Sequence, residues 1–151
     1  MFEYFRPFIH CGDEPNLFIT VAAEDILAAE QRLGIKFPLQ LRIFYQEIGH
    51  GFWCKGIDDI SQTYNTNHLL DPTTIADIVS DDEHHKRPLE GIPSDEVPFF
   101  EVNRHHLLTF RPHDKNPNIV FDAGESIGDF ENFMSRLYRH ARFWLTRSKE
   151  S

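Results

Sequence analysis

The segment from Ala28 to Gly51, AAEQRLGIKFPLQLRIFYQEIGHG, is the part of the chain that most narrowly constrains the fold. It contains two helical patterns joined by a link of only a few residues. Gly34 is placed to take the left-handed conformation that ends a helix, and Pro38 supplies the preset φ with which the next helix begins. Because the link is so short, we expect the two helices to fold against each other with a fixed crossing.

Each of these two helices carries an apolar stripe. In the first, Ile26, Ala29 and Leu33 share one face, and Thr20 precedes the helix as its expected cap. The second ends at Gly49, and its expected buried residues are Leu41, Phe44, Tyr45 and Ile48.

The rest of the chain predicts strands and two further helices. Asp71 and Pro72 indicate the start of a third, short helix, and Asp129 is the expected cap of a last one. The stretches VPFFEV, HLLTF and NIVFD predict an antiparallel meander, and FWCKGI and ISQTY are typical of short strands. The polar residues 81–96 predict a surface loop. With 151 residues, the chain is expected to form one domain over 1–151.

The cysteines and the N-terminus favour a reduced, cytoplasmic protein. Cys11 and Cys54 form no C-x-x-C pair, so neither a disulfide scaffold nor a zinc ribbon is expected. The N-terminal stretch MFEYFRPFIH is interrupted by Glu3, Arg6 and Pro7, which predicts that it is not a signal peptide. No apolar run approaches the length needed to cross a membrane.

The charge of the chain argues against direct nucleic-acid binding. The formal net charge is −9, and the Lys and Arg residues are scattered rather than gathered in a run. An acidic surface suits a basic partner, although many acidic proteins carry such charge for solubility alone.

One motif raises the possibility of catalysis. GESIG, from Gly124 to Gly128, matches the G-x-S-x-G pattern in which a nucleophilic serine, here Ser126, lies on a turn between a strand and a helix. That arrangement requires an acid and then a histidine later in the chain, and only His140 follows. We therefore favour a local turn, and a small serine hydrolase remains a remote alternative.

No cofactor or metal site is expected. There is no phosphate-binding glycine loop and no histidine spacing typical of zinc sites. The pair His105 and His106 would face opposite sides of a strand, and the pair His84 and His85 lies in an acidic polar loop that we interpret as solvated. Trp53 follows the helix-ending glycines, where it is either an exposed interface residue or a core residue.

The pattern AEQRLGIKFPLQLRIFYQEIGHGFW resembles the signature of the SUKH superfamily, which includes the Smi/Knr cell-wall-assembly regulators and many bacterial immunity proteins. LLDPTTIADIV, VPFFEV and IGDFENFMSRL continue the resemblance further along the chain. The positions that match the signature are Glu30, Leu33, Gly34, Pro38, Phe44 or Tyr45, Gly49 and Gly51.

The resemblance implies an α+β fold with helices packed around a central, mainly antiparallel sheet, and it implies no catalysis. It implies an immunity protein that binds and neutralises a cognate toxin, such as a basic nuclease, or else a regulatory or scaffold module. We expect a monomer or weak homodimer. The expected partner-binding residues are Trp53, Asp58, Asp59, Asp81, Asp82, Glu83, Asp95 and Glu96.

Overall fold

A seven-stranded antiparallel sheet organises the protein. The structure is a computed structural model and describes residues 1–10, 16–54, 66–80, 91–103 and 106–141. The strands lie in the sheet in their sequence order, and each pairs antiparallel with the next. They are β1 (Leu17–Ile19), β2 (His50–Phe52), β3 (His68–Leu69), β4 (Val97–Asn103), β5 (His106–Phe110), β6 (Ile119–Asp122) and β7 (Glu125–Asp129).

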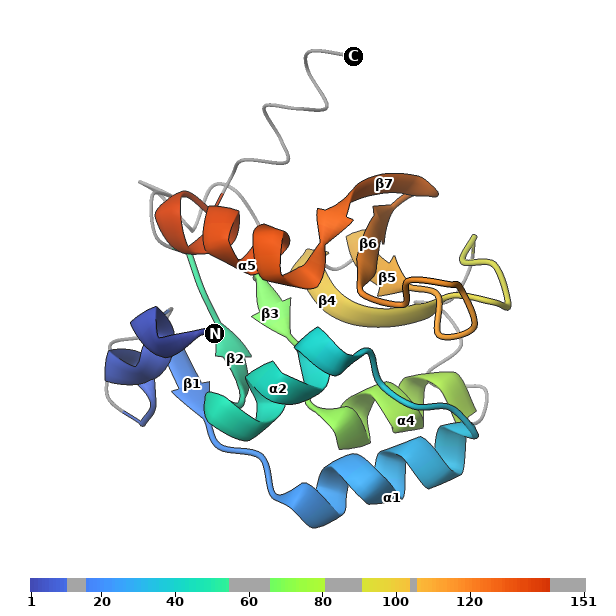
Figure 1. The fold of residues 1–151 in the computed structure, drawn as a ribbon, viewed down its shortest axis with the longest axis horizontal. Helices are drawn as coiled ribbons and strands as arrows, with labels where there is room; N and C mark the ends of the chain where they lie inside the picture. Colours follow the sequence, from blue (N-terminus) through green and yellow to red (C-terminus); the bar gives the residue numbers. More distant parts are fainter. Residues whose placement is uncertain (11–15, 55–65, 81–90, 104–105, 142–151) are drawn as a thin grey trace.

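Helices pack against this sheet and complete the α+β fold that was expected. They are the 3-10 helix η1 (Glu3–Phe8) and the α-helices α1 (Ala23–Leu33), α2 (Leu39–Glu47), α4 (Pro72–Ser80) and α5 (Phe130–Arg139). In Figure 1, α2 and α5 cross in front of the strands, and α1 and α4 lie together below them. The described helices are all too short or too polar to cross a bilayer.

The two faces of the sheet differ sharply in burial. On the inner face, Phe18 packs on Phe44 of α2 with ring centroids 5.6 Å apart, and Phe100 packs on Phe133 of α5 at 5.2 Å. On the opposite side, the part formed by β1, β2, β3 and the adjoining ends of β4 and β5 is called the outer face below. It is half-buried except for Ile19, which is exposed, whereas Thr109 and Phe121 further along this side are buried. The residues of the outer face are Leu17, Ile19, His50, Phe52, His68, Glu101 and Leu107.

The short link between α1 and α2 is held by a buried carboxylate. Gly34 ends α1 with φ 67°, as expected, and its N–H bonds to the Glu30 carbonyl. The side chain of Glu30 turns inward, and its Oε2 accepts hydrogen bonds from Phe37 N at 2.8 Å and from Arg42 Nη2 at 2.5 Å. One carboxylate therefore joins α1, the link and α2.

The capping predictions are confirmed for two helices and wrong for one. Asp129 accepts from Asn132 N at 2.8 Å at the start of α5, and Asp71 accepts from Thr74 N at the start of α4. Thr20 does not cap α1, because that helix begins after Ala22 and Thr20 Oγ1 bonds to a ring nitrogen of His10 instead. Similarly, Pro38 stands one position before α2 rather than inside its first turn.

The strand predictions hold best in the second half of the chain. VPFFEV, HLLTF and NIVFD form β4, β5 and β6 as an antiparallel meander. Of FWCKGI, only Phe52 is in a strand; Trp53 and Cys54 follow it, and the remaining residues, together with ISQTY, lie outside the described ranges. The same holds for most of the predicted loop 81–96, of which residues 91–96 are described.

Gly49 marks a close approach between the end of α2 and β1. Its φ is 125°, and a Cβ at this position would lie 1.9 Å from the carbonyl oxygen of Ile19. A side chain of any size would therefore push β1 away from β2.

We predict that Glu30→Gln lowers the free energy of unfolding by about 2–3 kcal/mol, because Arg42 would lose its ion pair in a partly buried site. The matched control is Glu24→Gln in the exposed first turn of the same helix, for which a change within about 0.5 kcal/mol is expected. Denaturant unfolding measures both. Equal stabilities of the two variants would contradict this role of Glu30.

We also predict that Gly49→Ala costs more than 2 kcal/mol of unfolding free energy, because it adds a backbone clash to a positive φ. Gly34→Ala is the control: its φ is 67° and no atom lies within 4 Å of the added Cβ, so only about 1 kcal/mol should be lost. The same unfolding assay compares them, and a smaller loss for Gly49→Ala than for Gly34→Ala would disprove the close approach.

Candidate functional site

The structure corrects the idea that Trp53 is an exposed interface residue. Trp53 is only 1% exposed. It follows β2 on the inner side of the sheet, where its ring packs on Phe5 and Phe8 of η1 at 5.1 and 4.7 Å and stacks on Tyr138 at 5.3 Å. Trp53 is therefore a core residue that holds η1 and α5 to the sheet.

Glu96 was also expected at the surface, and it is buried instead, with 6% exposure. Its carboxylate accepts a hydrogen bond from Thr109 Oγ1 at 2.5 Å and pairs with Arg111 Nη2 at 3.2 Å. The Arg111 guanidinium in turn lies 3.8 Å from the centroid of the Phe121 ring. Because these partners replace water, Glu96 serves the sheet and is not free to meet a partner.

Only one of the expected partner-binding residues is both described and exposed. Asp95 lies at the surface just before β4. The acidic residues Asp58, Asp59, Asp81, Asp82 and Glu83 lie outside the described residues.

Ser126 does not have the geometry of a nucleophile elbow. Ala123 and Gly124 both have positive φ and form the tight turn of a hairpin, so GESIG enters β7 rather than a strand-to-helix turn. Ser126 pairs with Phe121, whereas the neighbouring pair joins Asp122 to Glu125. Since neighbouring residues of a strand face opposite sides, Ser126 points away from the His106–Asp122 pair. The GESIG stretch thus gives no support to the hydrolase alternative.

The described residues support neither a metal site nor a reactive cysteine. No three side chains of His, Cys, Asp or Glu come together there as a metal site. His106 bonds to Asp122 at 2.6 Å; His84, His85 and His105 lie outside those ranges. Burial raises the pKa of the free thiol of Cys54 to about 11, which keeps it protonated and unreactive.

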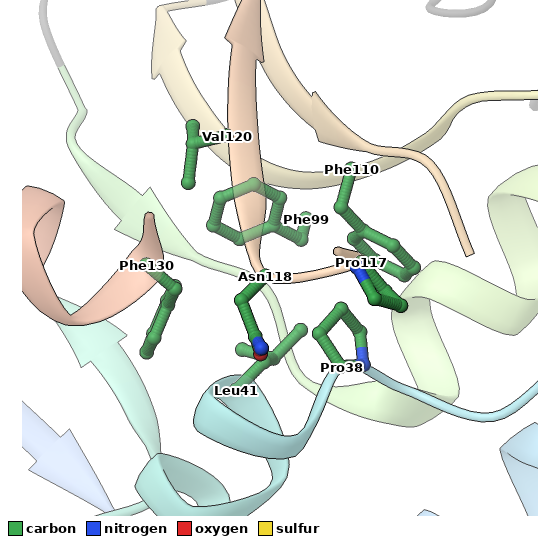
Figure 2. A pocket seen from close by; sticks show the side chains of 8 residues that line it. All are labelled: Pro38, Leu41, Phe99, Phe110, Pro117, Asn118, Val120 and Phe130. Carbon is green, nitrogen blue, oxygen red and sulfur yellow. The ribbon is translucent and has the colours of Figure 1, made fainter. Parts of the chain in front are cut away.

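A small apolar pocket opens where α2 begins, between β4, β6 and α5 (Figure 2). Its cavity volume is about 10 Å³, room for about one water molecule and well below that of typical sites for small molecules, roughly 300–1,000 Å³. Asn118 lies at its side and accepts a hydrogen bond from Gln40 N at 3.0 Å, tying β6 to α2. The lining is Pro38, Leu41, Phe99, Phe110, Pro117, Asn118, Val120 and Phe130. It is a packing feature with no chemistry for a substrate.

The outer face holds two histidines that the sequence analysis did not single out. The imidazole of His68 stacks on Phe52 with centroids 4.2 Å apart and an interplanar angle of 12°, and His50 lies 6.3 Å from His68. His50 Nδ1 and His68 Nε2 are buried and have no hydrogen-bond partner among the described residues. The alternation in HGF and the pairing of β2 with β3 place both rings on one face, and only that pairing could have revealed them.

The surroundings of His68 disfavour its charged form. Burial, and then the neighbouring His50, lower the pKa of His68 to about 4, while Asp71 acts weakly in the opposite direction. Burial also lowers the pKa of His50. Both rings are therefore neutral near pH 7, and protonating them in the folded state is unfavourable.

We predict that acid destabilises the protein through His68. Its folded pKa lies below its unfolded value of about 6.5, so this contribution is complete above pH 6.5 and is lost as the pH falls toward 4. His68→Gln should therefore reduce the loss of unfolding free energy between pH 7 and pH 4.5 by about 1–3 kcal/mol. Denaturant unfolding at the two pH values measures it, with the exposed His10→Gln as control. An identical pH dependence in wild type and His68→Gln would rule this contribution out.

Comparisons with known proteins identify the family of this chain. The model of the SMI1 / KNR4 family (SUKH-1) matches residues 20–140. "Immunity protein YxxD" of Bacillus subtilis (strain 168) is 30% identical over 140 residues, which cover 89% of this chain and 91% of that protein. No solved structure matches the chain. With a family match over most of its length and this relative, the chain belongs to the SMI1/KNR4 family, SUKH-1.

Proposed function

We propose that this protein is an immunity protein, which binds a cognate toxin domain and neutralises it without catalysing a reaction itself. The observation that carries the proposal is the 30% identity to a protein named as an immunity protein, extending over nearly the full length of both chains. An alignment of that extent covers the helical pair and the sheet together, so the shared feature is the whole fold and not a short motif.

The site geometry is compatible with a binding role. Ser126 faces away from the His106–Asp122 pair, and the pocket beside α2 is too small for a typical substrate. The protein can instead bind a partner through its surface. Binding through a surface needs shape and charge complementarity, and it needs no reactive group.

We further propose that the toxin domain is basic, as a nuclease domain would be. The net charge of −9 favours association with a positive surface and repels acidic ones. Exposed carboxylates occur on several elements, including Glu24 and Asp25 on α1, Asp95 before β4 and Glu131 on α5. Asp95 remains a candidate contact, together with the acidic residues at 58–59 and 81–83. The protein acts in the cytoplasm as a monomer or weak homodimer.

The proposal predicts that a toxin domain is encoded beside this gene, and that cells survive that toxin domain only when they also express this protein. Growth after induction of the toxin domain, with and without the immunity protein, is the measurement. The control is an inactive toxin domain, which should be harmless in both cases. Continued killing despite abundant folded protein would contradict an immunity role and favour a regulatory or scaffold module.

If the toxin domain is basic, its rate of association with this protein should fall at least about tenfold as the salt concentration rises from roughly 20 to 300 mM. The reason is that salt screening shortens the range of the attraction between the two proteins. Stopped-flow binding with the inactive toxin domain measures this rate. A rate that does not change with salt would remove the basic partner from the account while leaving immunity intact.

A further inference from the structure

We propose that the toxin domain docks on the outer face of the sheet, across β1, β2, β3, β4 and β5, and that it brings apolar side chains and at least one cation to this face. The inference rests on the proposed immunity function and specifies where the binding takes place and with which chemistry.

The first support is a row of side chains that are apolar or aromatic except for Glu101. The pairing of the strands places Leu17 beside Phe52, Phe52 beside His68, and Leu107 one strand beyond Glu101. These residues are only half-buried, and Ile19 at the end of β1 is 44% exposed. On the inner face, by contrast, the residues between them in sequence, Phe18 and Leu69, are each 1% exposed. An apolar surface left partly open in this way is typical of protein-interaction sites.

The second support is the fixed arrangement of this row. The rings of Phe52 and His68 stack face to face, 4.2 Å apart, so each ring holds the other in place on neighbouring strands. Both strands are held on the inner side by buried residues, which leaves little freedom for the two rings to move. A preorganised aromatic surface loses little entropy on binding and is common at the centre of interfaces.

The charge of the outer face identifies the partner's chemistry. Glu101 lies in the middle of the row, and its Oε1 accepts a neutral hydrogen bond from Thr66 Oγ1 at 3.1 Å. Within the described chain no Lys or Arg forms an ion pair with it. The guanidinium of Arg111, just past the other end of β5, pairs with Glu96. Among the described residues the face therefore presents one carboxylate and no cation among apolar groups, which complements a Lys or Arg flanked by apolar residues.

The exposed side chain of Leu27 does not form such a surface. Leu27 on α1 is 60% exposed, but it projects beside the exposed residues Glu24, Ala28 and Gln31. Single exposed leucines are normal on soluble proteins. Leu27 therefore provides a matched comparison for Ile19.

The test is the affinity for the inactive toxin domain encoded next to this gene, measured by isothermal titration calorimetry at about 150 mM salt. Ile19→Lys should raise Kd at least tenfold, whereas Leu27→Lys, which makes the same change of charge on α1, should stay within about threefold of wild type. Glu101→Gln should raise Kd about tenfold, and Glu24→Gln should not change it measurably. Thermal unfolding establishes that each variant is folded; Ile19→Lys alters an exposed position and keeps the test valid if Glu101→Gln unfolds.

The outcomes separate the two levels of the proposal. If wild type binds and neither Ile19→Lys nor Glu101→Gln weakens binding, or if Leu27→Lys weakens it as much as Ile19→Lys, the outer face is excluded and immunity stands. If only Ile19→Lys weakens binding, the cation opposite Glu101 is excluded. If wild-type protein does not bind the toxin domain at all, the proposed function fails, and the docking face fails with it.

Discussion

The buried carboxylate of Glu30 is the contact on which the helical part of the structure depends. It is 7% exposed, and a single oxygen joins α1 to the backbone of the link at Phe37 and to Arg42 of α2. A buried carboxylate without partners would be very costly, so α2 must stay where Arg42 can reach. With α2 held there, Phe44 is positioned against Phe18, and the strands can pair beneath it.

The same arrangement explains why the two faces of the sheet can have different roles, one in stability and one in binding. The inner face is closed by α2, α5 and η1, and its aromatic rings pack edge to face into a continuous core. That core carries most of the stability, and the side chains on the outer face are only half-buried, so fewer of their contacts are needed for folding. These side chains can change to suit a partner with little effect on the fold, which is what a protein needs if it must match one toxin and not another.

Sequence patterns predicted the parts of this structure that local chemistry decides. Gly34, Asp71 and Asp129 mark helix ends through their own backbone and side-chain bonds, and the last meander has strands long enough to recognise. The short strands β1 and β3 form by pairing with segments distant in the sequence. With only three and two residues, they show no recognisable strand pattern in the sequence. Trp53 was left open between surface and core, and Glu96 was placed at the surface, because the sequence around them does not show their partners, η1 and Arg111. The acidic residues at 58–59 and 81–83 remain untested predictions.

The measurement that tests the central claim most directly is the titration of the purified toxin domain's activity with this protein. If the protein is an immunity protein that acts by occupying the toxin, activity should fall linearly and reach zero at one equivalent, with a stable complex recovered at that ratio. Full toxin activity in the presence of a large excess of folded protein would contradict the account.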